Sequence, residues 1–145
     1  SVLSLTGDGL SQFFWPVRVY YEDTDSGGVV YYANYLKFME RARTEYLRSL
    51  GFEQDRLRME QGILFAVHSL QVNYRQPARF NDTLDISAEM SNIRRTSLTF
   101  TQRVLQHDAG DLLCEGEVRI ACVEDGSFKP MPIPETIRSE LLNAS

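Results

Sequence analysis

Two carboxylates stand shortly before a pair of glycines and an expected helix start in the first third of the chain. Asp23 and Asp25 are two residues apart, Gly27 and Gly28 follow, and a helix-like segment begins near Asn34. The free N–H groups of a helix N-terminus can stabilise an oxyanion, while a nearby carboxylate can attack a carbonyl carbon or activate water. The spacing therefore allows an active loop for hydrolysis. An ordinary turn, in which aspartate and glycine are also common, is the competing interpretation.

The length and composition indicate a single globular domain. The chain has 145 residues, of which 43% are hydrophobic and 24% are charged, enough to build one core. Residues 1–12 show no hydrophobic period and are expected to form a flexible N-terminal arm before a domain at residues 13–145. The sequence has no run near the ~18 to 20 apolar residues of a membrane span and no signal-peptide pattern. We therefore expect a soluble, cytoplasmic protein.

The charge and the few metal-binding side chains disfavour some classes of protein. A net charge of −5 disfavours a general nucleic-acid binder, although clustered arginines can still hold an anionic ligand. Cys114 and Cys122 are eight residues apart on one expected strand, about 26 Å at ~3.3 Å per residue, so we expect buried thiols rather than a disulfide. With two histidines and no Cys-x-x-Cys spacing, no zinc site is expected. His68 is interpreted as a core histidine and His107 as a turn residue.

Residues 34–50 have the pattern of an amphipathic helix that Gly51 ends. Arg43 projects into the apolar side, where a guanidinium requires a partner. We expect it either to pair with an acidic residue of the preceding loop, such as Asp23, or to extend its charged end to solvent. Glu40 falls on the polar side. The apolar arc, about 140° wide, comprises Tyr35, Leu36, Met39, Ala42, Tyr46, Leu47 and Leu50.

Most of the remaining chain alternates in the manner of β-strands. Leu84, Ile86, Ala88 and Met90 would share one face of a strand, which is the period of a sheet with one buried side. Short polar breaks between the segments suit antiparallel hairpins. The expected strands are residues 14–21, 63–74, 83–92, 97–106 and 112–123.

Two further segments complete the expected fold, which is of the α+β class. A polar connector is expected at residues 55–62, and a closing helix with Pro134 at its first position is expected to run to Leu142. One long helix and a five-stranded antiparallel sheet can bury their apolar sides if the sheet wraps around the helix. Such a sheet keeps a second face and open edges. We therefore expect a homodimer or homotetramer, with a site that can lie between subunits.

The acidic loop and the helix after it resemble the signature of a known family. Residues 22–35 read Glu-Asp-Thr-Asp-Ser-Gly-Gly-Val-Val-Tyr-Tyr-Ala-Asn-Tyr, and residues 38–45 read Phe-Met-Glu-Arg-Ala-Arg-Thr-Glu. This pattern is similar to that of the 4-hydroxybenzoyl-CoA thioesterase (4HBT) family, which has the hot-dog fold. Within the family it most resembles the YbgC-like acyl-CoA thioesterases associated with the tol-pal system. The similarity runs from about Trp15 to the closing helix and includes residues 74–79 and 94–97.

The resemblance implies hydrolysis of acyl-CoA thioesters without a metal or another cofactor. By position in the motif, Asp25 is the catalytic carboxylate, and the backbone N–H of Tyr32 polarises the thioester carbonyl. Arg94 and Arg95 correspond to the pair that approaches the CoA phosphates. From its place alone, Arg79 is a weaker candidate for the same anion site. The sequence departs from the branch at Tyr32, where the branch usually has His, and this change bears on the acyl preference more than on the reaction class.

The residues themselves leave several roles open. Asp25 can act as a nucleophile or as a general base, and its sequence context does not separate these routes. Asp23 is interpreted as a group that forms hydrogen bonds or pairs with a buried arginine. Glu40 is an alternative carboxylate, placed on the helix itself. Gly27 and Gly28 permit positive φ angles and close approach of a substrate, or simply form a turn.

The leading hypothesis is an acyl-CoA thioester hydrolase that acts on short-chain or aromatic acyl groups. One alternative is a non-catalytic module of the cell-envelope system that binds acyl thioesters or acyl carrier protein. A hot-dog dehydratase is the other alternative. Dehydratase chemistry usually uses a histidine in the loop, and no histidine lies between Phe13 and Leu64.

Overall fold

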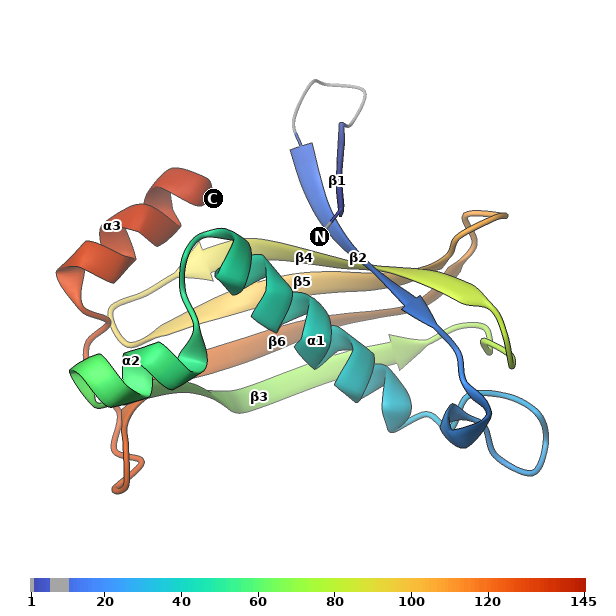
Figure 1. Cartoon of the computed structure of the whole chain (residues 1–145), viewed down its shortest axis with the longest axis horizontal. Coiled ribbons are helices and arrows are strands. Elements are labelled where there is room, and N and C mark those ends of the chain that lie inside the picture. Colours follow the sequence, from blue (N-terminus) through green and yellow to red (C-terminus); the bar gives the residue numbers. More distant parts are fainter. Residues whose placement is uncertain (1, 6–10) are drawn as a thin grey trace.

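One long helix lies across one face of an antiparallel sheet (Figure 1). The computed structural model describes residues 2–5 and 11–145. Within this part of the chain, six strands follow one another in the order β1-β2-β4-β5-β6-β3, and every neighbouring pair is antiparallel. The strands are β1 (Val2–Leu5), β2 (Ser11–Arg18), β3 (Ile63–Tyr74), β4 (Thr83–Ile93), β5 (Ser97–Gln106) and β6 (Leu112–Glu124); the helices are α1 (Asn34–Ser49), α2 (Gln54–Gln61), α3 (Glu135–Ala144) and the short 3₁₀ helix η1 (Tyr21–Asp23).

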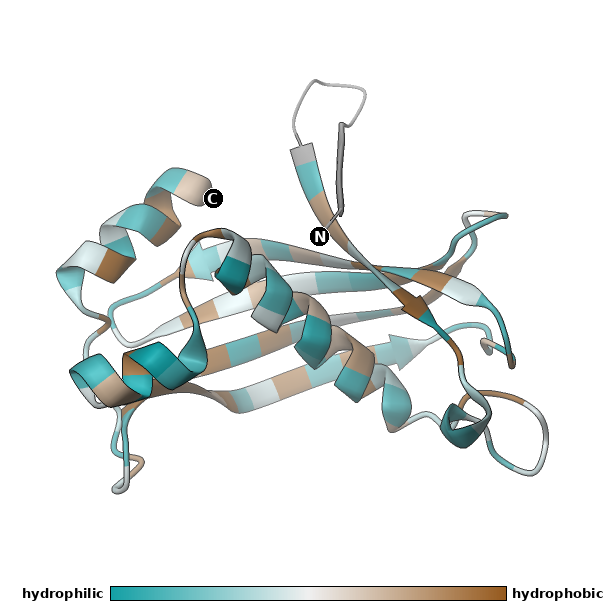
Figure 2. Ribbon diagram, in the orientation of Figure 1, coloured by the Kyte–Doolittle hydropathy of each residue, from teal (hydrophilic) through white to brown (hydrophobic). Residues whose placement is uncertain are grey.

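The core fills the space between α1 and the sheet, which confirms the α+β class and the hot-dog arrangement. Strands β2 to β6 are the five that the sequence predicts, and β1 adds a short strand at one edge. The inward residues of β4, from Leu84 to Met90, are buried as the alternation predicts. Figure 2 shows the same alternation of apolar and polar residues along the strands. Burying each large apolar side chain of this core contributes ~1.5–3 kcal/mol to folding.

The first strand of the domain is shifted relative to the prediction of residues 14–21. β2 begins at Ser11 and ends at Arg18. Beyond Arg18 the Asp23 carboxylate accepts a hydrogen bond from the Tyr20 N–H (2.8 Å), and η1 follows. This local bond competes with pairing in the sheet and ends the strand.

Part of the predicted N-terminal arm pairs with the sheet. Val2–Leu5 form β1 antiparallel to β2, and Ser11 and Gln12 are the first residues of β2. Residues 1 and 6–10 of the arm lie outside the described residues. The flexibility of the arm stays a prediction.

The polar connector predicted at residues 55–62 is wrong, because α2 occupies Gln54–Gln61. Leu57 is its buried residue, and Gly62, at φ 67°, ends it in the left-handed conformation. A helix with a single buried apolar residue lacks the repeated apolar positions by which an amphipathic helix is recognised in a sequence.

The closing helix is confirmed as α3, with different ends. Pro134 is the N-cap rather than the first helical residue, and the helix runs to Ala144. Ile137 and Leu141 bury its inner side in the core. None of the helices in the described ranges has the length and apolar content needed to cross a membrane.

Arg43 is buried, and its predicted pairing with an acidic loop residue is wrong. Its Nη1 donates to Gln102 Oε1 (2.9 Å). Gln102 Nε2 in turn donates to the carbonyl oxygens of Met39 (2.9 Å) and Ser87 (3.1 Å). The side chain of Gln102 therefore ties α1 to two strands. Because Gln102 lies 59 residues away in the sequence, no local spacing indicates this partner.

Neither histidine lies in the core, so the interpretation of His68 is wrong. His68 is exposed and lies where the β3–β6 register shifts between Val67 and Ser69. Such a bulge turns a side chain away from the face that simple alternation predicts. His107 is exposed as predicted, and its Nδ1 lies 2.8 Å from Asp85 Oδ2, a hydrogen bond that raises the pKa of His107. Across the described residues, no three His, Cys, Asp or Glu side chains are grouped to hold a metal ion.

The two cysteines are buried and free, as the spacing predicts. Burial raises the pKa of Cys114 to about 12 and that of Cys122 to about 11. Both thiols therefore stay protonated near neutral pH, and neither has the character of a nucleophile.

Strand β3 is an open edge of the sheet. Gln54 closes it at one position, because its Nε2 donates to Phe65 O (3.1 Å) and its Oε1 accepts the Phe65 N–H (3.1 Å). Farther along the strand, Val67, Leu70 and Tyr74 are exposed. A long edge with exposed apolar side chains is a surface on which another strand can pair.

Candidate active site

The acidic loop is a tight turn between η1 and α1. Thr24 and Val30 pair as an isolated bridge, the Asp25 N–H donates to Val29 O (2.9 Å), and the Gly28 N–H donates to Asp25 O (3.0 Å). Gly28 has a φ of 80°, which other residues adopt only at a cost in free energy. The loop backbone is thus fixed by its own hydrogen bonds.

Asp25 is exposed, and one of its carboxylate oxygens is already bonded. Oδ1 accepts the Gly27 N–H (2.8 Å), which is the geometry of an Asx turn. Oδ2 has no hydrogen-bond donor among the residues that the structure describes. The bond to Gly27 fixes the orientation of the carboxylate and leaves one oxygen for a carbonyl carbon or a water molecule.

Asp23 frames the loop, in line with its interpretation as a hydrogen-bonding residue. Its Oδ2 accepts the Tyr20 N–H (2.8 Å), and its backbone carbonyl accepts both the Tyr31 N–H (3.0 Å) and Asn34 Nδ2 (2.9 Å). These bonds join η1 to the start of α1. The alternative role of Asp23 as the partner of Arg43 is wrong.

The start of α1 offers two backbone donors without acceptors. The Tyr31 carbonyl accepts the Asn34 N–H (2.8 Å), and the Tyr32 carbonyl accepts the Tyr35 N–H (3.3 Å). Within the described residues, no acceptor bonds the N–H of Tyr32 or Ala33, and no side chain caps the helix. Such donors at a helix N-terminus, together with the helix dipole, favour an oxyanion.

Tyr74, at the end of β3, is a site residue that sequence reasoning missed. Its hydroxyl donates to the Tyr32 carbonyl (3.2 Å), and its ring lies 5.9 Å from the Tyr32 ring and 5.6 Å from the Tyr35 ring. The Tyr35 hydroxyl accepts the Ala78 N–H (2.8 Å). The sequence gives one signal for this role, an aromatic residue at the end of an expected strand. Nothing in the sequence indicates its contact with Tyr32, which lies 42 residues away.

Arg79 is brought to the same loop. Val29 and Arg79 form an isolated bridge, and the Val30 N–H donates to Ala78 O (2.8 Å). The side chain of Arg79 is exposed. Asp25, Gly27, Gly28, Tyr32 and Arg79 therefore gather at one end of the sheet.

Arg94 and Arg95 do not join this group within one chain. They lie in the connection between β4 and β5, at the opposite end of the sheet from the acidic loop (Figure 1). The 11 residues of β4, at ~3.3 Å per residue, separate the two ends by roughly 30 Å. Both arginines are exposed.

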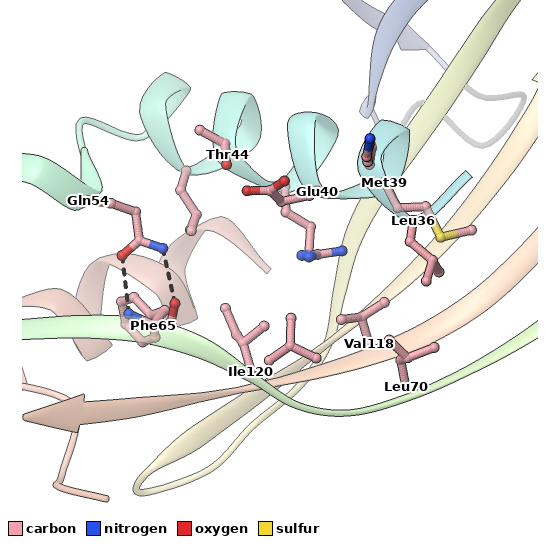
Figure 3. Close-up of a pocket in the computed structure, with 13 residues that line it drawn as sticks. Leu36, Met39, Glu40, Thr44, Gln54, Phe65, Leu70, Val118 and Ile120 are labelled. Carbon is pink, nitrogen blue, oxygen red and sulfur yellow. Dashed lines mark hydrogen bonds between the residues drawn. The ribbon is translucent and has the colours of Figure 1, made fainter. Parts of the chain in front are cut away.

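A groove of about 400 Å³ runs beside α1, between the helix and strands β3 and β6. Figure 3 shows Glu40 and Thr44 of the helix facing Val118 and Ile120 of the sheet across it. The groove begins at Leu36, in the first turn of α1. Sequence reasoning missed it because its walls come from elements far apart in the chain.

An antiparallel sheet packed around one long helix is the arrangement of the hot-dog class of folds. Residues 27–113 match the family described as the thioesterase superfamily (4HBT). The chain is 49% identical over 128 residues to the acyl-CoA thioester hydrolase YbgC of Escherichia coli O6:H1, covering 88% of this chain and 94% of that protein. It is 44% identical to the acyl-CoA thioesterase YbgC of Haemophilus influenzae, over 88% of this chain and 92% of that one.

A solved structure agrees with this assignment. The probable thioesterase from Bartonella henselae is 32% identical and superposes with a TM-score of 0.78, covering 85% of this chain and 99% of that one. The chain therefore belongs to the thioesterase superfamily.

The two glycines of the loop should respond differently to substitution. Gly28→Ala is expected to lower the free energy of unfolding by about 1 kcal/mol, because alanine resists a positive φ. Gly27→Ala should cost less stability, although its Cβ would lie 3.2 Å from Asp25 Oδ1 and displace that carboxylate. Urea denaturation of both variants measures the difference. Equal losses would contradict the assigned backbone conformations.

Proposed function

We propose that this chain hydrolyses acyl-CoA thioesters at the acidic loop, with Asp25 as the reacting carboxylate and the Tyr32 N–H as the oxyanion donor. The observation that carries the proposal is the pairing of two groups at one helix start. A fixed carboxylate with an available oxygen lies in the same short loop as an N–H without an acceptor. Membership of the thioesterase superfamily makes thioester hydrolysis the matching reaction.

Two routes use the same groups. If Asp25 is the nucleophile, Oδ2 bonds to the thioester carbon, the CoA thiolate leaves, and water then hydrolyses the mixed anhydride. If Asp25 is the general base, it takes a proton from water, and the hydroxide so formed attacks the carbon and expels the thiolate. In both routes the carbonyl oxygen becomes an oxyanion at the Tyr32 N–H. One well-placed donor of this kind is worth ~2.7–4 kcal/mol.

The hydrogen bonds around the helix start support this role of the Tyr32 N–H. That N–H belongs to the same peptide group as the Tyr31 carbonyl, which is held by the Asn34 N–H. The next carbonyl, of Tyr32, is held by the Tyr74 hydroxyl. Both peptide planes are therefore oriented before a substrate arrives, which is what preorganised stabilisation of an oxyanion requires.

The proposed binding of the CoA part requires a second copy of the chain. Gly27 and Gly28 allow close approach at the reacting carbon, and Arg79 lies beside the loop. Arg94 and Arg95, the proposed phosphate contacts, lie roughly 30 Å away at the other end of the same sheet. A two-fold axis that pairs the β3 edges antiparallel would bring the partner's far end next to this loop.

The edge of β3 supports such a dimer. The edge is long and open, and it exposes Val67, Leu70 and Tyr74 among polar residues. Gln54 occupies the edge at Phe65, so another strand could pair only with the residues after Phe65. A homodimer is the smallest assembly that completes the site, and a homotetramer would need a further contact between two dimers.

We also propose the substrates, a partner and the cellular location of the enzyme from the family resemblance. The substrates are short-chain or aromatic acyl-CoAs, and the change from His to Tyr32 bears on which of them is preferred. Acyl carrier protein is a further proposed partner, because it carries acyl groups as the same thioester. The cytoplasm and the tol-pal association are proposed on the resemblance alone.

Experiments can distinguish the two alternative functions from this proposal. A non-catalytic module fits the Asx turn that already engages Asp25, and it would bind acyl-CoA without releasing thiol. A hot-dog dehydratase would hydrate an enoyl thioester without releasing thiol. His68 lies on β3 and His107 follows β5, so neither supplies the loop histidine of that chemistry.

Asp25→Asn is expected to lower kcat/KM for thioester hydrolysis by about 10² to 10⁴, because the amide is neither a nucleophile nor a base at neutral pH. Thiol release from butyryl-CoA and 4-hydroxybenzoyl-CoA measures it. Asp23→Asn is the matched control, since an amide oxygen can still accept the Tyr20 N–H. Normal turnover by Asp25→Asn would contradict the proposed role.

Mixed dimers test whether the site is shared. Asp25→Asn and the double variant Arg94→Ala/Arg95→Ala should each be impaired alone, Asp25→Asn in kcat and the double variant in KM. Co-expression in equal amounts should restore about a quarter of wild-type activity, because half of the dimers are mixed and each of these has one intact site. The activity is measured by thiol release at limiting acyl-CoA. If Arg94 and Arg95 served the loop of their own chain, mixing would restore nothing.

A further inference from the structure

The groove beside α1 contains a buried charge that forms no ion pair within the described residues. Arg43 is 8% exposed and lines the groove. Its hydrogen-bond partner, Gln102, is a neutral amide. Among the described residues, no carboxylate forms an ion pair with Arg43. A buried guanidinium in this state is stabilised by any anion that can reach it.

The other polar groups of the groove do not neutralise Arg43. Lys37 and Glu40 line the groove and are both exposed, so the lining as a whole has one excess positive charge. Burial lowers the pKa of Arg43, and the nearby charge of Glu40 only partly opposes this effect. The remaining walls are largely apolar, with Leu70, Val118 and Ile120 on the side of the sheet.

The distance from the start of α1 to the guanidinium of Arg43 sets how long a ligand must be to reach both. Gln102 bonds both Arg43 and the Met39 carbonyl, so the guanidinium lies near the level of Met39. Met39 is six residues beyond Ala33, about 9 Å along the helix axis at 1.5 Å per residue. The groove itself begins at Leu36, next to the helix start.

We propose that this groove binds the acyl part of the substrate and that Arg43 pairs with a carboxylate at the far end of the acyl chain. The substrate class would then be CoA thioesters of short dicarboxylic acids with a chain of about six carbons. Five bonds of an extended chain advance ~6 Å, and the contact with the guanidinium adds ~3 Å. Arg43 is a specificity residue in this arrangement and takes no part in bond breaking. The inference rests on the proposed thioesterase function.

Three substrates of equal chain length test the proposal: adipyl-CoA, 6-hydroxyhexanoyl-CoA and hexanoyl-CoA. The wild-type protein is expected to show a kcat/KM at least about tenfold higher for adipyl-CoA than for either of the others, a gain typical of a charge-assisted pair. Arg43→Met should remove this preference while hydrolysis of hexanoyl-CoA continues. Arg43→Lys should retain part of it. Arg48→Met, an exposed arginine of the same helix outside the groove, is the matched control.

The outcomes separate this inference from the proposed function. Hydrolysis of hexanoyl-CoA at least as efficient as that of adipyl-CoA by the wild type would overturn the inference and leave the thioesterase function standing. The same result is expected if a carboxylate of a second copy already pairs with Arg43. Equal use of the hydroxyl and carboxylate substrates would overturn the role of charge. Thiol release from none of the three, nor from shorter or aromatic acyl-CoAs, would instead contradict the proposed function.

Binding gives a readout that does not depend on hydrolysis or on a folded Arg43→Met variant. The wild-type protein is titrated by calorimetry with two thioether analogues of CoA, one bearing a 5-carboxypentyl group and one a hexyl group. Tighter binding of the carboxyl analogue by about tenfold is expected. Equal or weaker binding of it would overturn the inference.

Discussion

The geometry of the candidate site depends on one backbone carbonyl, that of Asp23. It accepts hydrogen bonds from the Tyr31 N–H and from Asn34 Nδ2, and so holds the acidic loop against the first turn of α1. Together with the hydrogen bonds inside the loop, these bonds fix the carboxylate of Asp25 relative to the N–H of Tyr32. A loop of this kind can place a reacting group and an oxyanion donor within reach of one carbonyl because both belong to the same rigid segment.

The same frame underlies the proposal that two chains share each site. The loop and Arg79 are brought together by short local connections, while Arg94 and Arg95 are carried to the other end by the length of β4. Antiparallel pairing of two β3 edges would place Arg94 and Arg95 of one chain near the acidic loop of the other. In this view the open edge of β3 serves the chemistry as well as the assembly.

The sequence allowed prediction of what depends on local pattern. The alternation from Leu84 to Met90 identified the buried face of β4, and the Asp-Gly-Gly spacing before a helix identified the loop. Contacts between distant segments were beyond reach: Gln102 meets Arg43 across 59 residues, and Tyr74 meets Tyr32 across 42. The bulge at His68 reversed an expected face, because one inserted residue changes the parity of a strand.

The vibrational frequency of a bound thioester carbonyl tests the central claim most directly. In the Asp25→Asn protein, where acyl-CoA should bind without turning over, infrared difference spectroscopy compares the carbonyl stretch of 4-hydroxybenzoyl-CoA when bound and when free. A donor without another acceptor, such as the Tyr32 N–H, should polarise the carbonyl and shift the stretch to lower frequency. A bound carbonyl with a frequency no lower than that of the free thioester would contradict the assignment of the loop and helix start as the site of hydrolysis.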